Sequence, residues 1–592
     1  MIKTHLALVA TIYFLLSFSI VISQPDTMDW WNPAGHPVPV IEGQAWTGEA
    51  KSPYDRLPSR AEGQVRDAVW NLAGHNAGIM VRFRSNAEEI VVRYQVAGNL
   101  EMNHMPATGV SGVDMYAIDH DGTWSWCRGQ RSFGDTITYH FRGLSPNGPF
   151  HKYGSEFRLY FPLYNKVTWL EIGVAKETYF EPLPVRLQKP IVVYGTSIVQ
   201  GGCASRPGMA WTSIVDRSLD HPLINLAFSG NGRLEKEVIE LIAEIDARIY
   251  ILDCLPNLTS SELYPDPEIA RRIMESVKYL KQKHPETPIL LVEHAGYTDG
   301  PIMPGRQQAF ERVNNVQRTT YSRLLQEGIS GLHYLSHDEL NLTIDDMVDG
   351  THPNDLGMQH YADAYVEKLR KVLHEPVGNS VTSIPRTQYR EPDNYDWEER
   401  HRDIILLNRQ ENPEIVFFAN SIIHFWGGLP QTKKRVEEES WSDYFTPMGV
   451  RNFAYGWDRV ENVLWRIYHG ELEDIKPKKI LVMIGTNNLH LNTDPEILEG
   501  LDLLIRGIKI RQPAAEIIFM GLLPRREYEE RIFNLNEKIA ILAGNLNVDY
   551  QYIGDIFLKE NKKIDEHLFS DGLHPNATGY IKMREALLPI LK

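Results

Sequence analysis

The sequence predicts two parallel-sheet α/β domains in tandem, preceded by an antiparallel β-sandwich. Three observations predict this fold. Strand and helix patterns alternate over two long stretches, a six-residue motif occurs near the end of each stretch, and short β-rich runs fill the region before them. At 592 residues the chain is too long for a single core, so several domains are expected.

The N-terminus has the pattern of a secretory signal. Lys3 supplies a positive charge, residues 6–22 are apolar, and the chain turns polar from Ser23. We expect cleavage of a signal peptide at 1–23 and a mature protein that is secreted or periplasmic. An uncleaved membrane anchor is the alternative, because the apolar run approaches the length of a span. No cysteine follows the run, so a lipoprotein is not expected, and no later stretch predicts a membrane span.

Composition narrows the choice of partners. The formal net charge of −16 disfavours a nucleic-acid or anionic-membrane surface. The three cysteines are too few for a disulfide framework and lack the spacing of a metal site.

Residues 24–186 predict the β-sandwich, which we expect to be jelly-roll-like. Short β-rich runs separated by Gly, Pro and Asn are typical of antiparallel sheets. The runs lie at 78–83, 89–96, 136–141, 157–161 and 167–174. This region is rich in tryptophan: Trp30, Trp31, Trp46, Trp70, Trp124, Trp126 and Trp169. Such side chains can stack on sugar rings, although a core position is expected for any single one.

Residues 187–375 and 401–592 each predict a parallel sheet with covering helices. A polar, proline-containing linker is expected at 376–400. Expected strands in the first domain lie at 191–194, 223–227, 249–252, 289–292 and 332–335. Those in the second lie at 415–419, 450–454, 480–484, 516–520 and 549–553. Expected helices include 235–245, 269–283, 495–510 and 531–543.

The repeated motif is D-G-x-H-P-N, at 349–354 and at 571–576. Each copy follows a Ser-Ile pair that ends the first strand of its domain. From Ser197 to His352 is 352 − 197 = 155 positions, and from Ser421 to His574 is 574 − 421 = 153. A helix cap explains one such loop, but two matched sets favour catalysis.

The residue types fit a nucleophile with its base. A serine hydroxyl needs a base within hydrogen-bond reach. His352 can take the proton of Ser197, and Asp349 can hold the ring of His352. Ser421, Asp571 and His574 repeat this set. The G-x-S-x-G elbow of α/β-hydrolases is absent. A metal site is the weaker alternative, because no third ligand stands at a useful spacing.

An oxyanion formed at such a serine needs hydrogen-bond donors. Gly230 follows the second strand of the first domain and Asn257 follows the third. Gly456 and Asn487 occupy similar places in the second domain. Sites in parallel sheets form at the carboxyl ends of strands, so these groups are expected to converge.

Both domains resemble SGNH (GDSL-type) hydrolases, whose four blocks supply Ser, Gly, Asn and a D-x-x-H pair. The resemblance implies a flavodoxin-like three-layer fold in each domain and no cofactor. Carried over by motif, it gives Ser197, Gly230, Asn257, Asp349 and His352 in the first domain. It gives Ser421, Gly456, Asn487, Asp571 and His574 in the second.

Two further resemblances are more local. Residues 112–116 (G-V-D-M-Y) resemble the β-rich G-x-D-L-Y module that precedes the catalytic domain in some SGNH esterases. Residues 485–488 and 522–525 make the second domain similar to platelet-activating-factor acetylhydrolase-like members. The family's G-D-S-x reads G-T-S-I and A-N-S-I here, and the third block of the first domain reads D-C-L-P-N.

The expected function is a serine esterase that removes short acyl groups, acetyl above all, from a small-molecule or glycan ester. His294 and Arg525, each after a fourth strand, are candidate substrate contacts; a structural histidine and a solvated loop are the alternatives. A lipase, thioesterase or phospholipid deacylase is the rival enzyme. A third hypothesis makes one of the two domains a non-catalytic glycan-binding scaffold.

Overall fold

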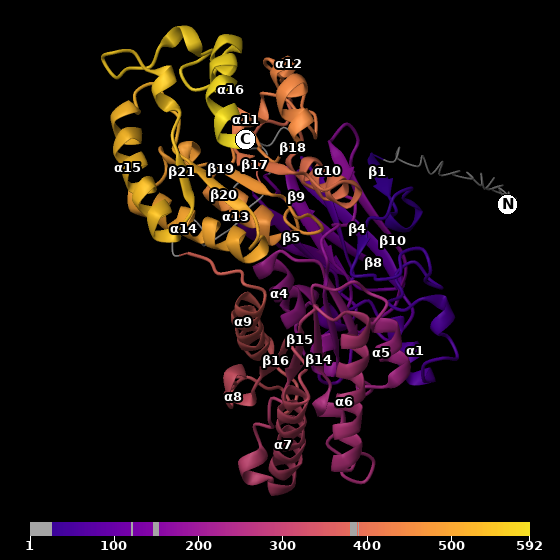
Figure 1. Cartoon of the computed structure of the whole chain (residues 1–592). Coiled ribbons are helices and arrows are strands. Elements are labelled where there is room, and N and C mark those ends of the chain that lie inside the picture. The colour runs from indigo at the N-terminus through magenta and orange to yellow at the C-terminus, as the bar shows by residue number, and fades with distance from the viewer. Residues whose placement is uncertain (1–26, 120–121, 146–152, 379–387, 389) are drawn as a thin grey trace, which may run out of the picture.

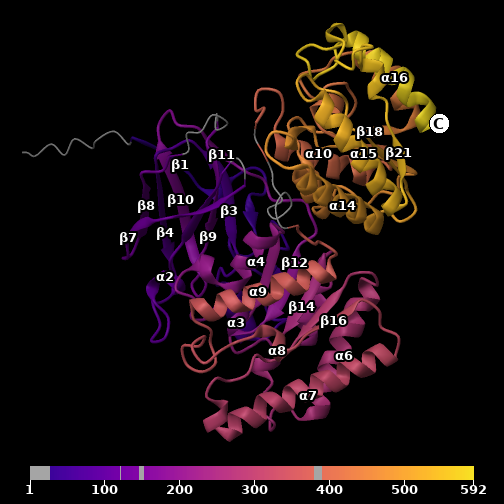
Figure 2. The same ribbon diagram turned by 90° about the vertical axis from the view of Figure 1, so that its left-hand side faces the viewer.

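The computed structural model describes residues 27–119, 122–145, 153–378, 388 and 390–592. The expected signal peptide lies outside the described residues. Figures 1 and 2 show three units that follow one another along the chain, each touching the other two. Among the described helices, none is long and apolar enough to span a bilayer.

The N-terminal unit consists of two antiparallel sheets that share one core. The first sheet has the order β1 (Met28–Trp31), β10 (Val167–Ala175), β4 (Glu89–Val96), β8 (Ile137–Arg142), β7 (Gly129–Ser132). The second has the order β11 (Phe180–Pro182), β3 (Met80–Ser85), β9 (Ser155–Tyr160), β5 (Asp114–Ile118), β6 (Trp124–Cys127), with β2 (Ile41–Glu42) paired to β3. Phe83, Tyr94 and Leu159 lie in the shared core. The antiparallel β-rich unit is confirmed, and its jelly-roll connectivity stays a prediction.

The first α/β domain has a parallel sheet of order β13 (Leu223–Ala227), β12 (Ile191–Gly195), β14 (Ile249–Asp253), β15 (Ile289–Val292), β16 (Leu332–Leu335). This 2-1-3-4-5 order is that of flavodoxin-like sheets. One face packs on α5 (Lys236–Ile242), α6 (Asp266–Lys283) and α7 (Pro304–Gln326). The other packs on α4 (Trp211–Leu219) and α9 (Asp355–Val372). The three-layer expectation is confirmed.

The second α/β domain repeats the design with the order β18 (Val450–Asn452), β17 (Ile415–Ala419), β19 (Lys479–Met483), β20 (Glu516–Met520), β21 (Asp549–Gln551). Its covering helices include α13 (Val460–Tyr468), α14 (Asp494–Arg511) and α15 (Glu529–Leu546) on one face. The C-terminal α16 (Ala577–Leu591) packs on the opposite face. Each strand expected in the two domains is present.

The expected linker differs in its last residues. Helix α10 (Trp397–Gln410) begins inside 376–400, because the Asp396 carboxylate caps it by accepting the Glu399 N–H at 2.8 Å. The end of this segment therefore belongs to the second domain.

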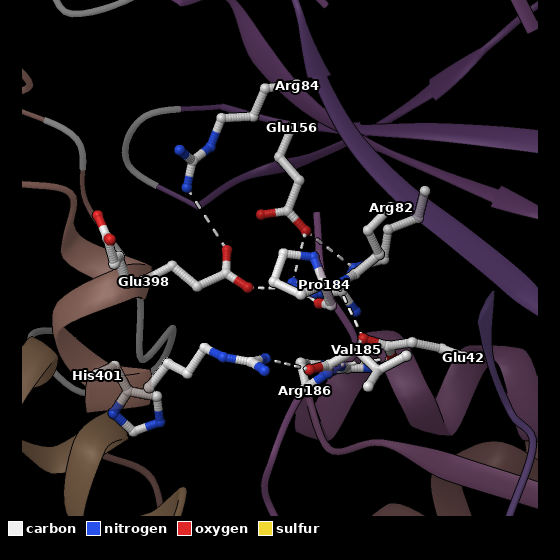
Figure 3. A network of polar contacts seen from close by, with 12 residues as sticks. Glu42, Arg82, Arg84, Glu156, Pro184, Val185, Arg186, Glu398 and His401 are labelled. Atoms are coloured by element: carbon white, nitrogen blue, oxygen red, sulfur yellow. Dashed lines mark hydrogen bonds and ion pairs between the residues drawn. The ribbon is translucent and has the colours of Figure 1, made fainter. Parts of the chain in front are cut away.

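A network of buried charges joins the units (Figure 3). Arg82 on β3 pairs with Glu42 at 3.0 Å, with Glu156 at 3.3 Å and with Glu398 on α10. Arg186, between the β-rich unit and β12, pairs with Glu42 at 2.7 Å and with Asp216 on α4 at 2.9 Å. Such ions tolerate burial only when they are paired, so the network fixes how the units sit together.

Candidate active sites

The first site lies at the carboxyl end of β12. Ser197 opens the short helix α3 (Ser197–Gln200) and is half-buried. Its Oγ is 2.8 Å from His352 Nε2. His352 Nδ1 is 2.8 Å from Asp349 Oδ2. The structure therefore brings together the serine, histidine and aspartate that the sequence singled out.

The D-G-T-H loop holds the aspartate in its charged form. Asp349 Oδ1 accepts the His352 N–H at 2.8 Å and the Thr351 N–H at 3.0 Å. Burial raises the pKa of Asp349, but the hydrogen bonds from the His352 ring and N–H outweigh it and leave that pKa below its ordinary value. A carboxylate here fixes the tautomer of His352 and stabilises the imidazolium.

The second site repeats this geometry after β17. Ser421 opens α11 (Ser421–His424), and its Oγ is 2.8 Å from His574 Nε2. His574 Nδ1 is 2.7 Å from Asp571 Oδ2. Asp571 Oδ1 accepts the His574 N–H at 2.8 Å, and its pKa is likewise lowered by His574 against the effect of burial.

An asparagine follows β14, the strand that pairs with the strand before Ser197. Asn257 lies in the turn after β14, and its Oδ1 accepts the Gly232 N–H at 3.0 Å. Because this bond uses the side-chain oxygen, the Nδ2 of Asn257 keeps its N–H groups as donors. Gly232 was not anticipated from the sequence. A Cβ there would stand 2.1 Å from the Gly195 carbonyl oxygen, so only glycine allows this approach to the serine loop.

Comparison with known proteins identifies the family. Residues 188–370 and 420–581 match models of the GDSL-like Lipase/Acylhydrolase family, and residues 28–180 match the N-terminus of Esterase_SGNH_hydro-type. Platelet-activating factor acetylhydrolase IB subunit alpha2 of Rattus norvegicus is 35% identical over 196 residues, which are 32% of this chain and 81% of the relative. The chain belongs to the GDSL-like acylhydrolase family.

Other relatives agree with this. The alpha1 subunit of the same acetylhydrolase from Homo sapiens is 30% identical over 200 residues, 33% of this chain and 82% of the relative. A putative GDSL-like lipase from Bacteroides ovatus is 30% identical with a TM-score of 0.53, covering 59% of this chain and 98% of that one. The tandem copies and the G-x-D-L-Y-type module of this GDSL-like hydrolase are thus confirmed.

The oxyanion loops of the two copies can be aligned on the structure. Asn225 Oδ1 accepts the Ala227 N–H at 3.0 Å, and Asn452 Oδ1 accepts the Ala454 N–H at 2.9 Å. Ala227 therefore corresponds to Ala454. Three residues further on, Gly230 has φ +69° and corresponds to Trp457, with φ +62°.

The expected donor Gly456 is therefore displaced by one position. Its N–H already donates to His424 Nδ1 at 2.8 Å, just as the Ser229 N–H donates to Gln200 Oε1 at 3.0 Å. The sequence argument looked for a glycine after the second strand, but here the residue with positive φ is Trp457. The N–H of Trp457, not that of Gly456, stands where the N–H of Gly230 stands in the first copy.

Asn487 is buried after β19 and is also held by the oxyanion loop. Its Nδ2 donates to the Asp458 carbonyl at 3.0 Å. An amide nitrogen carries two N–H groups, so one remains for a reacting carbonyl. The N–H groups of Ser197 and Ser421 lie in first helical turns, where no intrahelical acceptor exists.

Each site is flanked by a segment from outside its own sheet. Tyr164, from the β-rich unit, donates its hydroxyl to the Ser197 carbonyl at 3.0 Å. The exposed His104 of the same unit has its ring centroid 6.0 Å from that of His352. At the second site, Tyr395 before α10 donates to the Gly456 carbonyl at 2.7 Å.

The two candidate substrate contacts make hydrogen bonds within their own domains. His294 is 1% exposed, its Nδ1 accepts the Gly296 N–H at 2.9 Å, and burial lowers its pKa to about 3. This neutral ring is packed inside the first domain. Arg525 donates to the Thr486 carbonyl at 3.3 Å, which supports the loop that carries Asn487.

Proposed function

We propose that this GDSL-like hydrolase is a secreted serine esterase that removes acetyl or other short acyl groups from carbohydrate at two sites. The observation that carries the proposal is the Ser–His–Asp chain of hydrogen bonds in both copies. Neither Ser–His–Asp set requires a cofactor, because a serine, a base and oxyanion donors suffice for acyl transfer.

The reaction follows from the geometry of the first site. Ser197 Oγ attacks the ester carbonyl while His352 Nε2 takes its proton, and the carbonyl oxygen becomes an oxyanion. The Asn257 amide and the Ser197 and Gly230 N–H groups donate to that oxygen. His352 then returns the proton to the leaving alcohol, which leaves an acyl-serine. Water activated by His352 releases the acid and regenerates Ser197. Ser421, His574 and Asn487 would act alike in the second site.

Three features support the finer parts of the proposal. The printed name of the curated relatives, acetylhydrolase, supports a short acyl group. The signal-like N-terminus supports export. Trp126, which is 49% exposed on the β-rich unit, supports contact with a sugar ring.

Serine variants test the proposal. We expect Ser197→Ala and Ser421→Ala each to remove the activity of one site, and the double variant to release no acetate from acetylated xylan or p-nitrophenyl acetate. Full activity in the double variant would disprove the serine mechanism. A series of p-nitrophenyl esters tests the acyl length, since a preference for long chains would point to a lipase instead. A single variant that loses nothing would assign its domain a scaffold role for that substrate.

A further inference from the structure

The two sites differ in the space beside the oxyanion loop. Gly230 in the first site is exposed, and a Cβ added to it would meet no described atom within 4 Å. Trp457 stands at the corresponding position in the second site and is 38% exposed. The first site is therefore open where the second carries an indole ring.

A carboxyl group adds to this difference. Glu391 lies just before α10, and its Oε2 is 2.4 Å from where a Cβ on Gly456 would be. The segment is anchored there by Tyr395 and Gln388, which both donate to the Gly456 carbonyl at 2.7 Å. The second site therefore has a carboxyl group beside its oxyanion loop, at the residue before Trp457.

The same carboxyl group lies against Gly456, next to Trp457 in the second site. Burial raises the pKa of Glu391, while the Asn394 side chain, the positive charges of Lys434 and His574 and the side chain of the adjacent Trp457 oppose that rise. The Oε2 of Glu391 is buried and accepts no hydrogen bond of ordinary geometry from the described residues, so it has an acceptor to offer to a substrate.

We propose that Trp457 and Glu391 are specificity-determining residues of the second site, which restrict it to compact acyl esters of hydroxyl-bearing alcohols such as partly acetylated sugars. The first site, with Gly230, takes bulkier esters. Trp457 excludes bulk by filling the space, and Glu391 accepts a hydrogen bond from a substrate hydroxyl. This inference rests on the proposed esterase function of both copies.

Reciprocal variants test the role of Trp457. Activity of the second site is isolated in a Ser197→Ala background and that of the first in a Ser421→Ala background. The measured quantity is the ratio of kcat/KM for p-nitrophenyl acetate to that for p-nitrophenyl hexanoate. We expect Trp457→Gly to lower this ratio about ten-fold in the second site, and Gly230→Trp to raise it about ten-fold in the first. Phe533→Ala, which removes an aromatic 57% exposed on α15, should leave both ratios unchanged.

Glu391 is tested with a substrate that carries hydroxyl groups. In the Ser197→Ala background, we expect Glu391→Ala to lower kcat/KM about ten-fold for a monoacetylated methyl xyloside. The value for p-nitrophenyl acetate, which has no hydroxyl, should change less than about two-fold. Glu391→Gln keeps an acceptor oxygen and should retain more of the sugar activity than Glu391→Ala.

The failures of the two proposals are distinguishable. If the Ser197→Ala protein hydrolyses p-nitrophenyl acetate but Trp457→Gly leaves the ratio unchanged, the specificity role of Trp457 is wrong and the esterase function stands. Equal losses on both substrates in Glu391→Ala would make Glu391 a structural residue. If the Ser197→Ala protein hydrolyses neither the sugar ester nor the p-nitrophenyl esters, the second site is no esterase for these classes and both proposals fail there.

Discussion

At the scale of single residues, the two copies share a triad but differ in their oxyanion donors. The side-chain oxygen of Asn257 accepts a hydrogen bond from the Gly232 N–H, whereas the side-chain amide of Asn487 donates one of its two N–H groups to the Asp458 carbonyl. The first amide thus keeps both N–H groups available and the second keeps one. Loss of the amide should lower mainly the rate of the chemical step, because the oxyanion forms only in that step.

Asn257→Ala is the direct test of this donor. In the Ser421→Ala background we expect kcat for p-nitrophenyl acetate to fall by about 10²–10³, with little change in KM. Steady-state kinetics measures both values. A rise in KM with kcat unchanged would show that Asn257 binds the ground state instead.

Single residues also show where sequence reasoning succeeds and fails. Ser197 and His352 could be identified because their spacing recurs at Ser421 and His574. Trp457 could not be identified in this way. Residue type does not determine the backbone angle φ, and the glycine that follows the second strand is Gly456. His294 follows the fourth strand as expected, but its ring packs against Tyr297 and Phe310 in the interior of the domain.

At the scale of elements, the β-rich unit is part of the support of the first site. The hydroxyl of Tyr164 holds the carbonyl of the nucleophile itself, and the loop bearing His104 lies beside the catalytic histidine. The sequence does not indicate whether this unit reaches a site. The answer needed the three-dimensional contact, since Tyr164 and Ser197 belong to different units.

Tyr164→Phe tests this support. We expect kcat of the first site to fall about three- to ten-fold, because one hydrogen bond of about 1 kcal/mol is lost behind the serine. The second site, assayed in the Ser197→Ala background, should be unaffected. Equal losses at both sites would indicate a general effect on folding.

An arginine on α7 braces the catalytic loop of the first domain. Arg306 donates to Thr351 Oγ1 at 2.8 Å and to the Gly350 carbonyl at 3.3 Å, and it pairs with Asp299 at 2.7 Å. The second domain has Arg526 beside the equivalent loop. The guanidinium of Arg526 pairs with Glu566 at 2.7 Å, and its backbone N–H donates to the Gly572 carbonyl.

Arg306→Ala should therefore act through the position of His352. We expect kcat of the first site to fall about ten-fold, with the pH profile and the KM for p-nitrophenyl acetate nearly unchanged. Arg306→Lys keeps the charge but not the forked geometry and should recover little. Full activity in Arg306→Ala would show that the loop holds its shape alone.

At the scale of the whole molecule, the buried charges between units predict an acid-sensitive stability. The pKa of Glu42 is lowered to about 2, because Arg186 and Arg82 outweigh the opposing effect of burial. Because the pKa of Glu42 is lower in the folded than in the unfolded state, its ionised carboxylate stabilises the folded protein, and this stabilisation is complete above about pH 4.5. This contribution, about 3 kcal/mol, is lost as the pH falls toward 2.

Urea unfolding from pH 7 to pH 2 measures this dependence, since the contribution of Glu42 is lost between about pH 4.5 and pH 2. We expect the free energy of unfolding to decrease with falling pH, and Glu42→Gln to flatten the decrease while lowering stability at pH 7. An unchanged slope in Glu42→Gln would assign the acid sensitivity to other carboxylates, such as Glu375, whose pKa is also lowered, by His221 and Arg248 against burial.

The fold itself was largely predictable, but the assembly of its units was not. Alternating patterns predicted the strands of both parallel sheets, since each strand is a local signal. The ion pair between Arg82 and Glu398 joins positions 316 residues apart. The residues around each of them in the sequence do not indicate which residue is its partner. Charge and burial in the assembled chain are required to see it.

That network also bears on how the chain can be divided. Severing it near Arg186 or Trp397 would separate Arg82 and Arg186 from counter-ions on the far side of the cut. Isolated pieces would present unpaired charges and uncovered apolar surface to water, and would be driven to reassociate or aggregate. A recombination event that moved one hydrolase copy alone would thus break these ion pairs. The ion pairs of Arg82, as much as catalysis, therefore favour inheritance of the two copies together.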